Sequence, residues 1–348
     1  MLFLSTTKGV FRVDPASGAA ARLGPADVST EALAVSSGGG GARGGDETIV
    51  AAVTPDYGLP MRRPLEPADH QGMVRSADGG RSWQPVQDGA AGQQVTALAA
   101  LDGGFLAGTD PAELIVSRDA GQTWARGQSL RELPGYGSWS YPLPPHTPHV
   151  MVIVPHPTAA DTVYAGIEVG GIVRSTDGGW TWQVIGDRRG AAVHPDIHGL
   201  AISAADPSVL YAATPQGVYY SSDGGESWEQ RIEGLEPLYC RPIVTHPQDP
   251  RVAVVVATYG ASGFFGIPAE RTGGAVFRTE DGGRTWRHVT AGLPAPLAPT
   301  PAMAVDPHRP DRFYLPLFSG QVYVSDDGGA TWRELASGLP PLLRAVAA

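Results

Sequence analysis

An eight-residue pattern recurs along the chain and constrains its fold more than any other feature. Its first copy, SADGGRSW, runs from Ser76 to Trp83, and each copy keeps an aspartate, a glycine and a final tryptophan. The other five copies begin at Ser117, Ser175, Ser221, Thr279 and Ser325. Successive aspartates lie 41 to 58 residues apart, a spacing typical of solenoids, propellers and other repeat proteins.

Each copy lies between two short apolar runs, as in GIVRS before Asp177 and WQVI after it. This arrangement predicts a strand, a tight turn and a second strand. The aspartate can accept hydrogen bonds from backbone N–H groups of the turn, and glycine readily adopts a positive φ. The tryptophan provides a large buried anchor at the start of the outgoing strand. We therefore interpret the repeat as a folding element and not as a set of catalytic aspartates.

The repeat resembles the Asp box, S-x-D-x-G-x-[ST]-W, which marks β-propellers such as sialidases, sortilin-type receptors and photosystem II assembly factors. The resemblance implies an all-β propeller in which each box joins the third and fourth strands of a blade, on the face opposite the functional site. It does not extend to sialidase activity. The nearest match to the sialidase F/Y-R-I-P motif is MRRP at Met61–Pro64, which lacks the aromatic residue and the isoleucine.

The first 24 residues predict a seventh blade that lacks one strand. LFLST and GVFRVD are expected strands, DPASG is a degenerate box, and AARLG is an outer strand. We predict that Leu342–Ala348 supplies the inner strand and closes the ring. The expected fold is a single seven-bladed β-propeller over residues 1–348. Its predicted blades cover 1–24 with 342–348, 30–89, 93–128, 148–187, 196–234, 239–292 and 300–338.

Charge and cysteine content restrict the partners and the compartment. The net charge is -10, and no cluster of Lys and Arg with interleaved aromatic residues occurs, which argues against nucleic acids and anionic membranes as partners. The one cysteine, Cys240, cannot form an internal disulfide. Neither a signal-peptide pattern nor a membrane-length apolar run is present. We expect a soluble, cytoplasmic protein; removal of an earlier signal peptide is the alternative.

Three connections are much longer than a turn requires, namely Thr54–Gly72, Gln128–Pro148 and Tyr259–Gly274. All three are expected on the upper face, which we define as the face opposite the boxes. Long loops in a compact domain usually carry function or are disordered, and these are rich in aromatic residues. We therefore expect a pocket over the central channel. Its candidate substrate-binding residues are Tyr57, Arg62, Tyr136, Trp139, Tyr141, Tyr259 and Phe264.

Register comparison between blades places several ionisable residues near the channel mouth. Counting back from the boxes puts Asp110 and Glu168 at equivalent ends of second strands, and a second spacing puts His149, His198 and Arg241 near the mouth. These five residues are the catalytic candidates, because carboxyl and imidazole groups perform acid/base catalysis. His149, His198 and Glu168 are also suitable ligands for a divalent metal ion, the one cofactor considered. Solvated loop carboxylates are the alternative interpretation.

Cys240 has two interpretations. A thiol beside Arg241 could be a nucleophile with His198 as its base, whereas a lone cysteine is also a common small core residue.

Three functions remain open from the sequence. The first is an enzyme of hydrolase or lyase type that acts on a small, partly apolar or aromatic molecule. The second is a binding or assembly protein that uses its upper face for a protein partner. The third is a glycoside hydrolase with paired carboxylates, for which the carboxyl separation is decisive.

Overall fold

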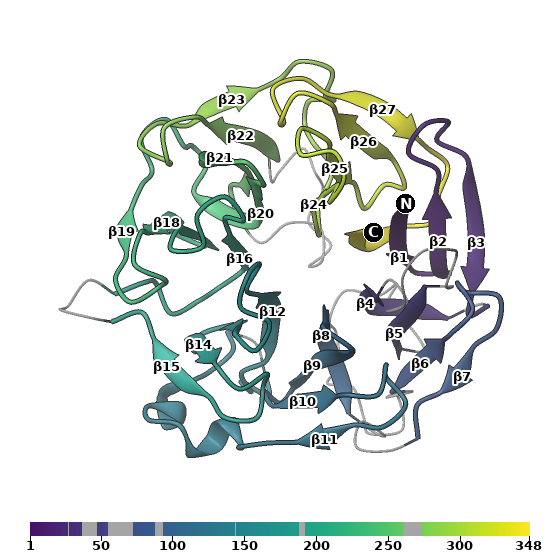
Figure 1. Cartoon of the computed structure of the whole chain (residues 1–348). Helices are drawn as coiled ribbons and strands as arrows, with labels where there is room; N and C mark the ends of the chain where they lie inside the picture. The colour runs from purple at the N-terminus through teal and green to yellow at the C-terminus, as the bar shows by residue number, and fades with distance from the viewer. Residues whose placement is uncertain are drawn as a thin grey trace.

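The computed structural model describes residues 1–26, 28–36, 47–54, 72–87, 93–142, 144–187, 192–260 and 273–348. Within these residues it shows seven four-stranded antiparallel sheets arranged as blades around a central axis (Figure 1). The predicted seven-bladed β-propeller is therefore confirmed. Three predicted substrate-binding residues, Tyr57, Arg62 and Phe264, lie outside the described residues.

Six blades are built from consecutive strands, ordered from the channel to the rim. Blade two contains β4 (Ser29–Ser36), β5 (Thr48–Thr54), β6 (Met73–Ser76) and β7 (Gln84–Pro85). Blade three contains β8 (Gln94–Leu101), β9 (Gly104–Asp110), β10 (Leu114–Ser117) and β11 (Ala125–Arg126). Blade four contains β12 (Val150–Pro155), β13 (Val163–Ile167), β14 (Gly171–Ser175) and β15 (Gln183–Ile185).

The second half of the ring repeats this order. Blade five contains β16 (Gly199–Ile202), β17 (Leu210–Thr214), β18 (Gly217–Ser221) and β19 (Glu229–Gln230). Blade six contains β20 (Tyr239–His246), β21 (Asp249–Thr258), β22 (Ala275–Thr279) and β23 (Arg287–Val289). Blade seven contains β24 (Ala304–Val305), β25 (Phe313–Pro316), β26 (Val322–Ser325) and β27 (Arg333–Ala336).

Blade one is made from both ends of the chain, as the sequence predicts. Its strands, from channel to rim, are β28 (Leu342–Ala347), β1 (Leu2–Thr6), β2 (Gly9–Val13) and β3 (Ala20–Gly24). The β1–β28 register pairs Leu2 with Ala347 and Ser5 with Arg344. This pairing closes the ring and leaves no open edge on β1.

The Asp boxes form side-chain-stabilised turns on the lower face. In the first box, Oδ1 of Asp78 accepts the N–H of Ser82 at 2.9 Å, and Oδ2 accepts its hydroxyl at 2.6 Å. The hydroxyl oxygen of Ser76 accepts the N–H of Gly80 at 2.8 Å. Asp14, in the degenerate box, accepts hydrogen bonds from Ala16 and Ser17. These contacts explain why the boxes are structural.

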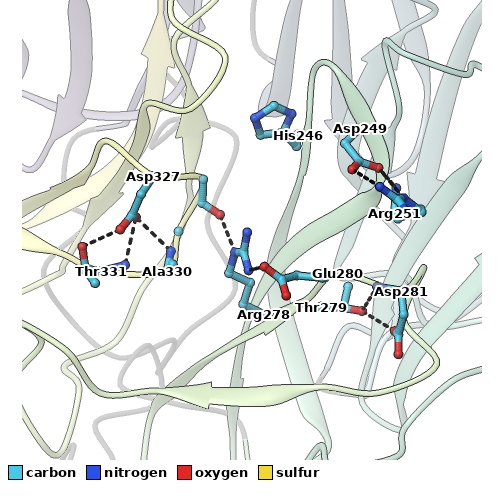
Figure 2. A network of polar contacts seen from close by, with 12 residues as sticks. His246, Asp249, Arg251, Arg278, Thr279, Glu280, Asp281, Asp327, Ala330 and Thr331 are labelled. Carbon is cyan, nitrogen blue, oxygen red and sulfur yellow. Dashed lines mark hydrogen bonds and ion pairs between the residues drawn. The ribbon is translucent and has the colours of Figure 1, made fainter.

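Arginines connect neighbouring blades through the boxes (Figure 2). Nε–H of Arg278, in strand β22 of blade six, donates to the carbonyl oxygen of Gly328 in the box of blade seven at 2.8 Å. Arg75 makes the same link to Ala120 of the next box at 2.6 Å, and Arg118 to Gly178 at 2.8 Å. The lower face is therefore joined from blade to blade by side-chain-to-backbone hydrogen bonds as well as by the apolar core.

The core lies between adjacent blades. One buried cluster joins Leu106 and Val116 of blade three to Val163, Ile167 and Trp182 of blade four. Each blade therefore packs an apolar face against its neighbour, which is the architecture expected of radially repeated sheets. No helix among the described residues has the length and apolar character needed to cross a membrane.

Candidate functional site

The candidate site lies at the upper mouth of the channel, where the inner strands of several blades begin (Figure 1). His149 immediately precedes β12, and His198 immediately precedes β16. Tyr239 and Arg241 are the first and third residues of β20, and Glu168 immediately follows β13. Because adjacent strands in a blade are antiparallel, the start of an inner strand and the end of its neighbour share one face.

The first ionisable pair is His149 with Glu168 in blade four. Nε2 of His149 lies 3.0 Å from Oε2 of Glu168, and the Glu168 side chain is 6% exposed. Burial works against protonation of His149, but the hydrogen bond and charge of Glu168 outweigh it and raise the imidazole pKa. Burial would also raise the pKa of Glu168, yet His149, Arg241 and His198 together lower it. Both pKa shifts favour the ionic form of the pair.

The second pair is His198 with Asp196 in blade five. Nδ1 of His198 lies 2.9 Å from the carbonyl oxygen of Cys240 in the next blade, and a carbonyl only accepts, so this nitrogen carries a proton. Nε2 lies 3.2 Å from Oδ1 of Asp196. Nε2 of His198 and Oδ1 of Asp196 are both buried, and neither has a hydrogen-bond partner within the described part of the chain. The second pair is therefore close but not bonded.

The two pairs meet. One ligand atom each from Glu168, Asp196 and His198 lie within 4.8 Å of one another. The metal ligands predicted from the sequence are His149, His198 and Glu168. Glu168 and His198 belong to this group of three, whereas its third member is Asp196 and not His149. Nδ1 of His194 accepts the N–H of Asp196 at 3.2 Å, so His194 supports the backbone of this cluster.

Tyr239 and Arg241 border the cluster on the side of blade six. The rings of Tyr239 and His198 lie 4.8 Å apart, and the Arg241 guanidinium lies 6.0 Å from the Tyr239 ring centroid. Burial raises the pKa of Tyr239, while Arg241 opposes this by its charge and a hydrogen bond. The charge of the predicted candidate Arg241 also acts on the Glu168 carboxylate and lowers its pKa.

Asp110 belongs to a neighbouring polar group at the same mouth. Its Oδ1 accepts the hydroxyl of Thr147 at 3.0 Å, and its charge acts on His149 and on Glu31. Burial raises the pKa of Glu31 to about 7, and Arg344, His149 and Gln94 only partly offset it. Glu31 and Arg344 are absent from the sequence-based candidates. Each is the one charged residue in an otherwise apolar or small-residue inner strand, which is the signal that would have found them.

The loop from Gln128 to Pro148 divides its aromatic residues between two roles. It contains two short 3-10 turns, η2 (Leu130–Glu132) and η3 (Tyr136–Ser138). Tyr136 and Trp139, with ring centroids 5.1 Å apart, pack against the apolar core of blades three and four. Tyr141 contacts His149 edge-on at 4.9 Å. Of these three predicted binding residues, Tyr141 is the one that touches the candidate site.

An apolar cavity of about 450 Å³ adjoins the site between blades five and six. Tyr239 lines this cavity, and its ring also lies 4.8 Å from the ring of His198 in the ionisable cluster. Tyr259, another predicted binding residue, lines the same cavity and is 68% exposed. The remaining walls are Pro215, Ile232, Leu235, Glu236, Pro237, Leu238, Thr258 and Gly260.

The nucleophile interpretation of Cys240 is not compatible with its environment. The residue is fully buried, and burial raises the pKa of its thiol well above the usual range. The proposed base, His198, contacts the carbonyl oxygen of Cys240 and not its sulfur. Cys240 is a core residue of the blade five and six cluster.

These features define the class of the protein: a seven-bladed β-propeller with Asp boxes and an ionisable site at the upper channel mouth. The BNR/Asp-box repeat model matches residues 219–230 and 323–334, so the chain carries repeats of this family. Among curated proteins, none matches the chain in sequence.

Solved structures with a similar fold include two GH74 enzymes and YCF48. The Niastella koreensis GH74 enzyme is 19% identical, with a TM-score of 0.62 over 95% of this chain and 51% of that chain. The Xanthomonas campestris GH74 xyloglucanase is 15% identical, with a TM-score of 0.66 over 97% and 52%. YCF48 bound to D1 peptide is 18% identical, with a TM-score of 0.52 over 76% and 74%. The chain thus spans about half the length of these GH74 enzymes, and these identities support the fold alone.

Proposed function

We propose that this protein is an enzyme that performs acid/base chemistry on a small, partly apolar molecule at the channel mouth. The observation that carries the proposal is the meeting of two imidazole–carboxylate pairs, His149–Glu168 and His198–Asp196, from adjacent blades. Burying ionisable groups is costly unless they are paired and hydrogen-bonded, and buried groups with perturbed pKa values are concentrated at active sites. A hydrolase or a lyase would use this combination of groups.

Each part of the site has a role in this proposal. His149, oriented by Glu168, transfers a proton, and Arg241 stabilises negative charge that develops on the substrate. The reacting group lies over the cluster. The apolar part of the substrate lies in the adjoining cavity, against Leu238 and Tyr259. Tyr239 links the two regions because it lines both.

A glycoside hydrolase is the second candidate, favoured by one distance. Carboxylate oxygens of Glu168 and Asp196 lie within 4.8 Å of each other. Retaining glycosidases place their carboxyl groups about 5 Å apart, and inverting enzymes about 6.5 to 9.5 Å apart. If this pair cleaves glycosides, the reaction is expected to retain the anomeric configuration. The fold shared with GH74 enzymes supports testing it.

A peptide-binding role is the third candidate, supported by a different surface. Tyr259 is exposed beside the apolar cavity, and exposed aromatic residues at a hollow are common in protein interfaces. The YCF48 structure of similar fold is a complex with a peptide. This role uses the cavity and needs none of the ionisable cluster.

Turnover of a defined substrate panel tests the enzyme proposal. The full chain is incubated with small esters, lactones, aryl glycosides and hydroxy acids that can undergo elimination, and products are followed by proton NMR. We expect turnover of at least one class, reduced by roughly 10²- to 10⁴-fold in His149→Ala and Glu168→Gln. Unchanged turnover in both variants would contradict the site assignment.

His246→Ala is the matched control. His246 is also a mostly buried histidine whose Nε2 lies 3.0 Å from a carboxylate, Oδ1 of Asp311. It lies near the boxes on the lower face (Figure 2). It is the last residue of β20, at the opposite end of that strand from the channel mouth. Its replacement should leave turnover unchanged, which separates loss of the site from loss of a buried imidazole.

A further inference from the structure

We infer that Glu168, Asp196 and His198 bind one divalent transition-metal ion at the channel mouth. The inference deepens the proposed function, since it assigns a cofactor to the same site, but its test does not require a substrate. The geometry that carries it is the approach of three ligand atoms from two adjacent blades to within 4.8 Å.

The hydrogen-bond pattern of His198 supports a metal ligand independently of the carboxylates. Its side chain is 1% exposed. Nδ1 donates to the Cys240 carbonyl oxygen, which leaves the lone pair of Nε2 directed into the cluster. Nε2 has no hydrogen-bond partner in the described ranges. Donation of one ring N–H to a backbone carbonyl is the usual arrangement when the other nitrogen binds a metal.

Asp196 also has a buried atom without a hydrogen-bond partner among the described residues. This atom, Oδ1, lies 3.2 Å from Nε2 of His198. Two acceptor atoms at this distance repel unless a proton or a cation lies between them, and leaving such atoms buried without a partner is costly. A metal ion bound by both atoms satisfies both. Their separation already matches the roughly 3.4 Å between neighbouring ligands of a tetrahedral zinc site.

Glu168 is placed to complete the site. Oε2 is already bonded to His149, which fixes the orientation of the carboxylate, as partners of metal ligands commonly do. The three ligand atoms lie within 4.8 Å of one another, so a contraction of about 1.4 Å at most brings them to the spacing of a zinc site.

The ligand types indicate the kind of ion. One imidazole nitrogen and two carboxylate oxygens suit Zn²⁺, and also Mn²⁺ or Fe²⁺, better than a purely oxygen-liganded ion. Three protein ligands leave a coordination position for water or for substrate, which is the composition of catalytic and not of structural zinc sites. Tyr239 lies beside the ligand His198, and Arg241 lies beside Tyr239.

Titration with Zn²⁺ tests the inference directly. The full chain, treated with a chelator and then dialysed, is titrated with zinc chloride by calorimetry, and Co²⁺ is used in parallel to report coordination through its visible spectrum. We expect one equivalent of Zn²⁺ and at least 100-fold weaker binding in His198→Ala, and Asp196→Asn should weaken binding by about 10- to 100-fold. His246→Ala should bind as the unmodified protein does.

Two results would overturn the metal assignment. One is the absence of saturable Zn²⁺ and Mn²⁺ binding at about 100 µM metal. The other is equal affinity in the unmodified protein and in His198→Ala, with circular dichroism confirming that the variant is folded. Because the titration contains no substrate, failure of metal binding is recorded separately from failure of turnover. Turnover of substrate by the chelator-treated protein, together with absence of metal binding, would support the proposed function and reject the metal site.

Discussion

Nε2 of His149 and Oε2 of Glu168 lie 3.0 Å apart and connect the inner strand of blade four to the strand beside it. The backbone repeats the link, because the N–H of Glu168 donates to the carbonyl oxygen of His149 at 3.0 Å. The pair is thus part of the channel mouth's structure as well as of the proposed chemistry, and the two contributions can be separated by substitution.

Glu168→Gln should separate chemistry from stability. An amide oxygen still accepts from Nε2 of His149, so we expect the free energy of unfolding to change by about 1 kcal/mol or less. Loss of the carboxylate charge should nonetheless abolish turnover. Urea denaturation of the variant, compared with its turnover, checks this. A loss of several kcal/mol together with the activity would instead indicate a structural role.

Glu31 should make stability fall as pH rises. Its pKa is raised to about 7 in the folded protein by burial, against 4.5 as its ordinary value, so between these values the folded state binds the proton more tightly than the unfolded state. The groups that face Glu31 are Arg344, His149 and Asp110, with Gln94 as hydrogen-bond donor. At about 1.4 kcal/mol per pKa unit, the stability lost between pH 4.5 and pH 7 is on the order of 3 kcal/mol.

Glu31→Gln provides the test of this pH dependence. The amide does not ionise, so the difference in unfolding free energy between variant and unmodified protein should grow in favour of the variant from pH 4.5 to pH 7.5. Guanidinium denaturation across this range measures it. Parallel curves for the two proteins would show that Glu31 does not titrate there.

Ala120→Gly should stabilise the protein. Ala120 has φ of 56° at the box position where the other five boxes have glycine, and a left-handed conformation costs a residue with a Cβ roughly 1 kcal/mol. The reverse change, Gly224→Ala, is the matched control. Gly224 has φ of +73°, and an added Cβ would meet only the Tyr164 hydroxyl oxygen, at 3.8 Å. Thermal unfolding should move up in the first variant and down in the second, and shifts of the same sign would contradict the strain argument.

Deletion of Leu342–Ala348 should open the ring. Without β28, strand β1 loses its inner partner, and the apolar cluster of blades one and seven loses Leu342. We expect a broader unfolding transition with a midpoint lower by roughly 10 °C or more. Deletion of Ala348 alone removes its two hydrogen bonds with Met1 and serves as control. An unaltered transition in the longer deletion would show that closure adds nothing to cooperativity.

The sequence predicts the fold well because each box is a local motif, formed by residues close together in the sequence. Asp, Ser and Trp within eight residues specify a turn and the two strands around it, and Asp14 shows that even a degenerate copy keeps the hydrogen bonds. Register comparison then brings Glu168 and His198 to one mouth. Both inferences depend only on repeated spacing along the chain.

The rest of the site has no local pattern. Glu31 and Arg344 come from strands that are distant in sequence, and each becomes informative only when the ring places it near His149. The loop aromatics show the same limit. Tyr136 and Trp139 pack on the core while Tyr141 touches the site, and an aromatic residue in a long loop is equally suited to either position.

The pairing of β1 with β28 places the two chain ends side by side, with the N–H of Ala348 donating to the carbonyl oxygen of Met1 at 2.9 Å. Blade one is therefore a complete four-stranded sheet although its strands come from both ends of the chain. A circular permutant, with the present ends joined by a short linker and new ends opened in another lower-face turn, should retain all seven blades. Fusions could then be attached beneath any chosen blade while the channel mouth stays untouched.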